Sequence, residues 1–561
     1  MNKRRFAGVL LVLCLFCAGF SLYAQSAAQE MEDLLAKDEL TYAEAARFIL
    51  KASEKFVTSD AEEAFWFAAK KGWLPKYTEP ADPARIDGIG LLIMNSFDIE
   101  GGFMYSVTKS PHYAFRELEY RNIIQGRADR YMKISGDFLI FTIGRVLSEI
   151  EKDAERAAKF ADERPSLRRK DRLQPESYDF GLILFQDSAF YHDFTYGTTD
   201  FIYRANAMPR VSFLLGNNGF FITSFGFAIE YGDEFKKAFE LLRTELSLRF
   251  GSFGIRAGRF NYADPMSFAL DSLYDGIMFS YNTGAGQFNV GSWYTGILYK
   301  KSANILMTEN DRDIYNAPFV KGDFFGTYFA PPRIIVSMDW DHPSISEFVQ
   351  LKTALSGQFD MSKQVGRLHS QYFTFSAGLN FSKFLVSAGG SIEAAEIKGA
   401  EETYRLAVAG ELGFYFPLRF KIDGQLSLKA RYGSGDTGKP FYAFTPVTTA
   451  YYGEIFQTGI SGHTMFDVTY SARFLETLGA IFNVSYFIRN DLMTPNTYII
   501  AGTDMRKKLL GMEISSKLVW NPFSDMEYSL GIGTFIPPFG NNWPNSRAIW
   551  KINLTTLLAL Y

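Results

Sequence analysis

The stretch Leu418–Tyr432, with the sequence LRFKIDGQLSLKARY, alternates between apolar and polar side chains over most of its length. Leu428 and Tyr432 fall on one face, and Lys429 and Arg431 fall on the other. Because successive side chains of a β-strand point to opposite sides, this pattern predicts a strand with one apolar and one charged face. A tilted strand of about ten residues is long enough to cross a bilayer.

The same alternation recurs along the chain from Tyr178 to Tyr561, with clear copies at 466–474, 482–489 and 512–520. We therefore predict a mainly β fold: a transmembrane antiparallel β-barrel with its apolar face in lipid and its polar face toward a lumen. A secreted β-sandwich also has alternating strands. It is the less favoured alternative, because its loops would not alternate so regularly between short and long.

Turn signals divide this region into eighteen strands, with sixteen as the alternative because the strands near 206–215 and 240–250 are weakly marked. Alternating connection lengths are typical of barrels with short periplasmic turns and long outer loops. The short turns are expected at 216–219, 251–252, 284–285, 341–346, 382–383, Pro417, 475–477 and 521–524. The long loops are expected at 188–205, 232–239, 262–275, 300–331, 360–368, 396–402, 433–462, 490–506 and 537–547.

The first residues have the features of a secretory signal peptide, predicted over 1–24. Lys3, Arg4 and Arg5 precede an apolar stretch, Phe6–Phe20, that is too short to span a membrane as a helix. Both cysteines of the chain, at 14 and 17, lie inside this segment. The mature chain is therefore expected to contain no disulfide and no thiolate metal site.

Composition excludes several classes of protein. The mean hydropathy of −0.07 argues against a helical membrane bundle, and the net charge of −4 without a basic block argues against nucleic acid binding. The aromatic content of 16% fits the aromatic girdles of a membrane barrel. None of the five histidines has a serine or carboxylate at a spacing that suggests a catalytic relay, so we predict no enzymatic activity, no cofactor and no metal site.

Residues 29–150 have helical rather than strand periodicity. Helices are expected at 40–50, 61–71, 113–122 and 135–149. Thr41 and Glu44 have the spacing of a capping box at the start of the first helix. The segment 64–93 recurs as 114–140, which indicates a small helical unit used more than once. A charged linker, 151–177, separates this domain from the barrel at 178–561.

Part of the helical region resembles an S-layer homology repeat. The segments Tyr113–Leu118, Ile123–Asp129 and Ile134–Gly136 carry the resemblance, and Thr41 and Glu44 match part of the threonine-arginine-alanine-glutamate motif of that family. The family is known for binding cell-wall polymers. The resemblance thus implies that Thr41 and Glu44 belong to a wall-binding site and that peptidoglycan is a partner. A helical spacer or plug without such binding is the alternative.

Tyr42 stands where the family motif has its arginine. The overall layout resembles the S-layer-homology porins, which combine a barrel in the bacterial outer membrane with a periplasmic helical domain. The last segment, Trp550–Tyr561, resembles the C-terminal assembly signal of outer-membrane barrels. These resemblances imply outer-membrane lipid and the barrel-assembly machinery as partners, with a homo-oligomer open by analogy.

Charged residues on the polar faces of the strands are candidates for the pore lining. Basic residues outnumber acidic ones, so we hypothesise a mild preference for anions. The alternative is that these charges pair across strands and cancel. The candidate residues are Arg243, Arg249, Arg256, Arg405, Arg419, Lys421, Lys429, Arg431, Arg473, Arg489, Lys517, Glu411, Asp423, Asp467 and Glu513.

The long outer loop from Lys300 to Arg333 combines acidic and aromatic residues. Its acidic residues could face basic walls across a narrowed channel. An ordinary surface loop and a metal site are the other interpretations, although the full ligand spacing of a calcium site is absent. The candidate constriction residues are Glu309, Asp311, Asp313 and Asp323.

Taken alone, the sequence thus predicts a porin-type channel for the passive diffusion of small hydrophilic solutes. The alternative is a structural tether between the outer membrane and the cell wall, or a surface adhesin, with a closed barrel.

Overall fold

The structure is a computed structural model. It describes residues 34–35, 37–121, 123–124, 130–150, 178–194, 196–216, 218–232, 235–320, 323–346, 348–362, 366–381, 383–398, 402–419, 423–436, 442–475, 477–491, 508–537 and 547–560. The predicted signal peptide and the predicted linker lie outside these residues. The chain divides into a compact helical unit before Ser177 and a compact strand unit from Tyr178 onward. In the described residues, no helix combines the length and apolar composition that spanning a bilayer requires.

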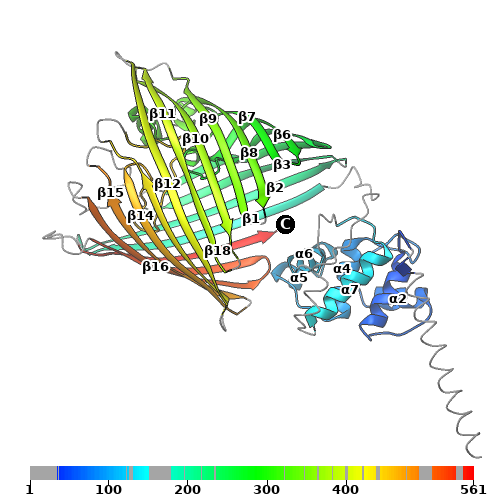
Figure 1. The fold of residues 1–561 in the computed structure, drawn as a ribbon. Helices are drawn as coiled ribbons and strands as arrows, with labels where there is room; N and C mark the ends of the chain where they lie inside the picture. Colours follow the sequence, from blue (N-terminus) through cyan, green and yellow to red (C-terminus); the bar gives the residue numbers. More distant parts are fainter. Residues whose placement is uncertain are drawn as a thin grey trace, which may run out of the picture. The chain divides into compact units, whose positions relative to one another are not determined.

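The helical unit contains two pairs of helices that repeat with one spacing (Figure 1). The first helices of the pairs begin at Ala61 and Pro111, and the second helices begin at Ile86 and Gly136. Both spacings are fifty residues, which matches the period seen in the sequence. The helices are α2 (Tyr42–Ala52), α3 (Ala61–Lys70), α4 (Ile86–Ser96), α5 (Phe103–Thr108), α6 (Pro111–Tyr120) and α7 (Gly136–Ile150).

A closed ring of three backbone hydrogen bonds joins the segments that precede α2, α4 and α7. Leu40 N–H donates to the carbonyl of Ile134 at 2.9 Å, and Ile134 N–H donates to the carbonyl of Ala84 at 3.0 Å. Ala84 N–H completes the ring by donating to the carbonyl of Leu40 at 2.8 Å. All three residues are buried. The unit is therefore built from three related segments, one more than the sequence repeat reveals.

The strand unit is a closed antiparallel barrel of eighteen strands (Figure 1), so the predicted fold and the higher strand count are confirmed. Consecutive strands are neighbours, and β1 closes the sheet by pairing with β18, from Leu182 opposite Leu560 to Asp193 opposite Ile549. The strands are β1 (Tyr178–Asp193), β2 (Thr198–Leu215), β3 (Gly219–Tyr231), β4 (Phe235–Phe250), β5 (Phe253–Ala263), β6 (Asp271–Thr283), β7 (Gly286–Tyr294), β8 (Arg333–Ser346), β9 (Val349–Asp360), β10 (Arg367–Asn380), β11 (Leu385–Lys398), β12 (Glu402–Arg419), β13 (Asp423–Gly433), β14 (His463–Leu475), β15 (Leu478–Arg489), β16 (Leu509–Phe523), β17 (Met526–Ile536) and β18 (Ile549–Leu560).

The longest connections lie at one end of the barrel, but the predicted alternation of short and long connections is incomplete. The connections predicted as long loops at 188–205, 232–239 and 396–402 span only 194–197, 232–234 and 399–401. Pro417 lies inside β12, and the connection to β13 is at 420–422, so the stretch Leu418–Tyr432 belongs to two strands rather than one. Proline usually marks an interruption because it cannot donate to a ladder. Here Pro417 lies beyond Tyr415, where the ladder with β11 ends, although its pairing with β13 continues opposite Gln425. Likewise 341–346 belongs to β8, and β2 begins at Thr198 instead of after a long first loop.

The two faces of the wall differ as the alternation predicts. On β14, the large side chains of Phe466, Val468 and Tyr470 are exposed on the outer face, and Asp467 and Thr469 alternate with them on the inner face. The outer faces of the other strands are similarly rich in exposed aromatic and aliphatic residues. A continuous apolar belt of this kind is unfavourable in water and is stable in lipid.

Candidate functional site

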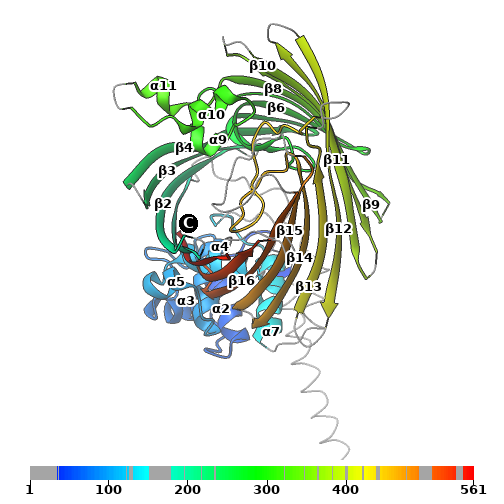
Figure 2. The same cartoon turned by 90° about the vertical axis from the view of Figure 1, so that its left-hand side faces the viewer.

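Two long loops at one end of the barrel fold into its interior. They are the β7–β8 loop, 295–332, and the β13–β14 loop, 434–462. Figure 2 shows the described part of the β13–β14 loop inside the ring of strands. Apolar residues of both loops are buried in one cluster with the inner faces of the strands: Leu298, Ile305, Met307, Phe444, Val447 and Ile460 pack with Tyr274, Trp293 and Tyr372. The lumen is therefore narrowed by loop residues at this end.

Glu393 fixes one part of the β13–β14 loop to the wall. Its carboxylate, on β11, accepts the backbone N–H of Thr445 at 2.7 Å and the hydroxyl of Ser370 at 3.0 Å. The hydroxyl of Tyr372 on β10 donates to the carbonyl of Thr445 at 2.6 Å. The wall thus satisfies both backbone groups of one loop residue, as buried backbone requires in the absence of secondary structure.

Glu513 fixes a second part of the same loop. This buried residue of β16 accepts three consecutive backbone N–H groups, those of Glu454, Ile455 and Phe456, at 2.7, 3.0 and 2.9 Å. Hydrogen bonds to an ionised acceptor are stronger than neutral ones. A carboxylate on a rigid strand therefore takes the place of a ladder for this irregular segment.

The β7–β8 loop contains three short helices, α9 (Lys300–Ala303), α10 (Glu309–Asn316) and α11 (Phe324–Tyr328). Helix α10 begins with a capping box in which Thr308 and Asp311 exchange hydrogen bonds. Asp311 also forms an ion pair with Arg333 at 2.6 Å, and the guanidinium contacts Asp360 at 3.4 Å and the side-chain oxygen of Gln358 at 2.7 Å. Arg333 is fully buried. This cluster binds the start of α10 to the wall.

Backbone hydrogen bonds also join the β13–β14 loop to the β5–β6 connection and to the β7–β8 loop. The carbonyl of Ala269, between β5 and β6, accepts the backbone N–H groups of Val447 and Thr448 at 2.9 and 3.2 Å. Thr449 N–H donates to the carbonyl of Asn304 at 3.0 Å. Asp264 shapes the β5–β6 connection by accepting four backbone N–H groups, and burial raises its pKa even though those donors favour the charged form. The constriction is one interlocked structure.

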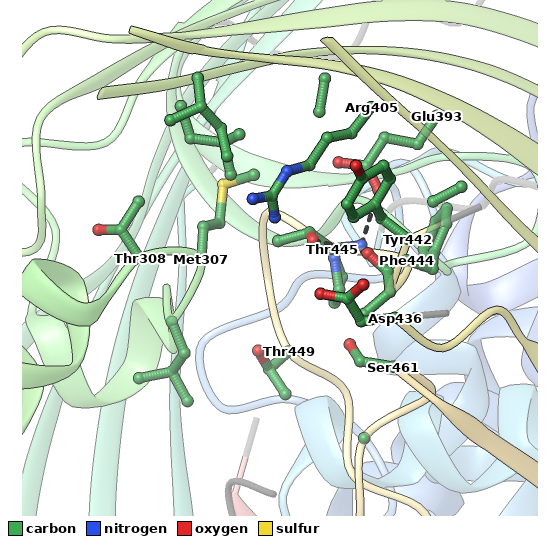
Figure 3. A pocket seen from close by; sticks show the side chains of 18 of the residues that line it. Met307, Thr308, Glu393, Arg405, Asp436, Tyr442, Phe444, Thr445, Thr449 and Ser461 are labelled. Atoms are coloured by element: carbon green, nitrogen blue, oxygen red, sulfur yellow. Dashed lines mark hydrogen bonds between the residues drawn. The ribbon is translucent and has the colours of Figure 1, made fainter. Parts of the chain in front are cut away.

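A cavity of about 480 Å³ lies between the two inward loops and the ends of β10, β11 and β12. Figure 3 shows Arg405 and Tyr442 on one side of it, with Met307 and Thr308 of the β7–β8 loop on the other. Apolar side chains form much of its lining. Its charged residues are Glu309, Arg312, Glu393, Arg405 and Asp436.

The two arginines of the cavity have unused hydrogen-bonding capacity. In the described part of the chain, the Nε atoms of Arg312 and Arg405 are buried and have no hydrogen-bond partner. The Arg405 guanidinium lies over the ring of Tyr442, 4.6 Å from its centroid, which orients the group without neutralising it. The cavity can therefore offer two cationic donors to a solute.

Other charged residues of the lumen are paired on the wall. Glu245, which is buried, binds Arg243 at 2.5 Å and Arg256 at 2.8 Å. Arg431 binds Glu411 at 2.5 Å and Asp467 at 2.7 Å. These five predicted lining residues and Glu245 form two clusters across neighbouring strands. Much of the basic excess is thus neutralised away from the cavity.

The remaining predicted lining residues have different surroundings. Arg249 and Arg473 are exposed near short connections, Lys429 lies over the ring of Tyr415 at 5.5 Å, and Lys517 is half-buried. Arg489 and Glu513 are buried rather than open to the lumen. The side chains of Arg419, Lys421 and Asp423 lie outside the described residues.

The four acidic residues of the predicted constriction loop are not brought together. Glu309 is exposed at the cavity, Asp311 is buried against Arg333, and Asp313 is exposed on α10. Asp323 caps α11 by accepting the N–H of Gly326 at 3.1 Å. In the described residues, no three His, Cys, Asp or Glu side chains form a group that could hold a metal ion.

In the helical unit, Thr41 and Glu44 form the capping box of α2 with reciprocal hydrogen bonds of 3.3 and 3.0 Å. Glu44 also forms an ion pair with Lys37. The hydroxyl and the carboxylate are therefore engaged in starting the helix.

Arg405 and Glu309, which line the cavity, are among the predicted site residues, whereas Glu393, Arg312 and Tyr442 were missed. Glu393 and Arg405 are in the inward phase of their strands, beside the exposed Ile392 and Leu406, so alternation could have placed both of them in the lumen. Of these two, only Arg405 was among the predicted residues. Arg312 and Tyr442 lie in loops, where no periodic signal indicates a direction.

No protein-family model matches the chain, and no curated protein matches it. Among solved structures, OccK11 (OpdR) of Pseudomonas aeruginosa is similar with a TM-score of 0.43 and 12% identity, covering 68% of this chain and 96% of that one. OccK5 (OpdH) of the same organism has a TM-score of 0.45 and 9% identity, covering 68% and 98%. OpdK of the same organism, solved with vanillate, has a TM-score of 0.45 and 10% identity, and the match covers 68% of this chain and 98% of that one.

Proposed function

We propose that this protein is a porin-type channel of a bacterial outer membrane that lets small hydrophilic solutes diffuse passively through its lumen. The closed barrel of eighteen strands, apolar outside and polar inside, carries the proposal. Barrels of this size leave a lumen that side chains of the strands alone cannot fill. The inward loops narrow this lumen to a selective passage. The first strand begins and the last strand ends at the side of the short connections, which favours a periplasmic position for residues 29–150.

The cavity supports a mild preference for anions. Arg312 and Arg405 have buried Nε atoms without partners, whereas Glu393 is engaged with Thr445. Glu309 and Asp436 also line the cavity and oppose the two arginines, so the preference is expected to be small.

The test is conductance of the refolded full-length protein in a planar bilayer under a potassium chloride gradient. We expect open channels whose reversal potential has the sign of a chloride preference. Arg405→Gln or Arg312→Gln should move this reversal potential toward zero. Arg473→Gln removes the same charge near a short connection and is the matched control. A potassium preference contradicts the anion proposal, and a bilayer without conductance supports the tether or adhesin with a closed barrel.

We also propose, as a second candidate function, that the helical unit contacts peptidoglycan. The threefold arrangement of helix-starting segments, with a capping box at the first, supports it. The full-length protein in detergent should then sediment with purified peptidoglycan sacculi, and a variant lacking residues 34–150 should not. Equal sedimentation of both forms contradicts wall contact. Outer-membrane lipid, the barrel-assembly machinery and a homo-oligomer are further proposed partners.

A further inference from the structure

The wall of the barrel is split between the outer parts of β4 and β5. The ladder between these strands ends at Thr244 opposite Arg259. Beyond that point, residues 235–243 of β4 stay paired with β3, and residues 260–263 of β5 stay paired with β6. In the described ladders, the outer part of β4 thus has only one neighbour, whereas a closed barrel normally leaves no strand edge.

Both strands are distorted where the ladder ends. The pairing of β4 with β3 shifts register between Ser224 and Phe225, which leaves Leu242 as an extra residue of β4. Gly258 of β5 has a φ of +108°, and a Cβ there would lie 2.0 Å from the carbonyl oxygen of Thr244. A bulge and a glycine with positive φ both turn a strand away from its partner. The split is therefore specified by the sequence.

Arg259 bridges the split from the outer side of the wall. It pairs with Asp275 of β6 at 2.6 Å, in the same outward phase as the exposed Ile277. Its guanidinium donates to the carbonyl of Leu241 across the split at 2.6 Å and to the carbonyl of Ile297 in the β7–β8 loop at 3.0 Å. Arg259 is buried, although its phase points toward lipid. An ion pair at such a place has to be shielded from hydrocarbon, and the loop supplies the shield.

Two further side chains of the β7–β8 loop hold the free edge of β4. The hydroxyl of Tyr328 donates to the carbonyl of Phe239 at 2.5 Å, and the hydroxyl of Ser302 donates to the carboxylate of Glu240 at 2.6 Å. Figure 2 shows α9 and α10 at this place, between β4 and β6. A few side-chain hydrogen bonds from one loop thus replace the ladder.

The same loop forms a wall of the cavity. Leu306 and Met307 line it, opposite apolar residues such as Ile397 and Phe444. The β7–β8 loop therefore separates the cavity from the split. Displacing it would carry Arg312 of α10 away with the loop and would expose to the outer leaflet an apolar chamber that contains the unpaired Nε of Arg405 on β12.

We propose that the split between β4 and β5 is a lateral passage, opened by displacement of the β7–β8 loop, through which amphipathic anions move between the cavity and the outer leaflet. The apolar lining suits the body of such a molecule, and the Arg405 guanidinium on β12 suits its charged head. Opening breaks the side-chain contacts of the loop, including the buried ion pair of Asp311 with Arg333, and its backbone hydrogen bond with Thr449, but it leaves every strand ladder intact. This passage goes beyond the proposed axial diffusion of hydrophilic solutes and shares only its membrane setting.

A thiol cross-link across the split tests the passage. Glu240→Cys with Ser302→Cys places two thiols where the native side chains touch, and the cysteines at 14 and 17 precede the predicted cleavage site. The full-length protein is placed in vesicles that contain albumin. The two introduced thiols are then cross-linked with the short linker dibromobimane. The probe is a pyrene-labelled alkyl sulfonate added outside, whose permanent charge slows spontaneous crossing. The matched control is Thr469→Cys with Asn483→Cys, a hydrogen-bonded pair across the continuous β14–β15 ladder.

We expect the cross-link at 240 and 302 to reduce probe transfer to the rate of protein-free vesicles, and the control cross-link to leave it unchanged. Tyr328→Phe removes the hydrogen bond to the carbonyl of Phe239 and should speed transfer about fivefold. Unchanged transfer after cross-linking, or transfer at the protein-free rate before it, overturns the lateral passage. Potassium chloride conductance of the same samples reports the axial channel separately: transfer without conductance contradicts the porin proposal and supports the passage.

Discussion

Helices α2 and α10 begin with the same local motif in two different environments. Each has a threonine at the N-cap and an acidic residue three positions later, and each pair exchanges two hydrogen bonds. The Glu44 side chain of α2 is 28% exposed and pairs with Lys37 on the surface. The Asp311 side chain of α10 is 2% exposed and pairs with the fully buried Arg333.

The difference teaches that one capping motif can start a helix or anchor a whole loop. At the surface the acid stabilises only its own first turn, because solvent screens its charge. In the barrel the carboxylate of Asp311 is held by a buried guanidinium that also contacts Asp360. Removing Arg333 therefore leaves two buried carboxylates without their cation, and removing Asp311 leaves the guanidinium with the longer contact to Asp360 at 3.4 Å. The tertiary environment, rather than the motif, thus sets how much the acidic residue contributes to stability.

The largest effect is expected from Arg333→Met. It leaves Asp311 and Asp360 buried without their cation, which costs about 3–5 kcal/mol. Thermal unfolding in detergent should shift down, and protease should cut the β7–β8 loop first. Arg473→Met, at an exposed position, should change neither. An unchanged unfolding temperature for Arg333→Met would show that this cluster does not hold the loop.

The comparison becomes quantitative with Asp311→Ala and Glu44→Ala. We expect Asp311→Ala to cost about 3 kcal/mol, because it leaves the Arg333 guanidinium without its 2.6 Å partner. Glu44→Ala should cost about 1 kcal/mol, the scale of a lost cap. Hydrogen exchange of the first-turn amides measures both in one sample. Equal costs would contradict the role given to burial.

The threonines should behave alike, in contrast to the acids. Thr308→Ala and Thr41→Ala each remove one hydroxyl that accepts a backbone N–H, which costs about 1 kcal/mol. Serine at either position should restore most of the loss. A much larger loss of stability for Thr308→Ala than for Thr41→Ala would show that the threonine also contributes beyond the first turn of its own helix.

The smallest effect is the pH dependence of the α2 cap. Burial raises the pKa of Glu44, but hydrogen bonds from Lys37 and Thr41 outweigh it and lower the pKa below its ordinary value. A lowered pKa means that the charged cap stabilises the helix above the ordinary pKa and that this contribution is lost as pH falls through the lowered value. Amides at the start of α2 should exchange faster at low pH after correction for intrinsic rates, and Glu44→Gln should remove the difference.

The sequence predicts what depends on local alternation. Phe466 and Asp467 lie on opposite faces because neighbours on a strand must, and the capping box of Thr41 and Glu44 follows from a spacing of three residues. The role of Asp311 could not be predicted, because its partner is Arg333, which follows one more helix, α11, at the start of β8. Glu513 binds the backbone of residues 454–456, and no side-chain pattern marks such an acceptor.

The split between β4 and β5 shows the same limit in the wall itself. Gly258 and Leu242 read as ordinary strand residues, since a register shift is visible only against the partner strand. The alternation of β4 and β5 nevertheless placed Arg243 and Arg256 on the inner face, where both bind Glu245.

The ring of hydrogen bonds among Leu40, Ala84 and Ile134 constrains how the helical unit can change in size. Each of the three residues donates one backbone hydrogen bond to one neighbour and accepts one from the other. Deleting any one repeat would leave one backbone N–H and one backbone carbonyl buried without a hydrogen-bond partner. A fourth repeat would find no free donor or acceptor in the ring. Such a unit tolerates longer links between its repeats, but it is gained or lost only as a complete triple.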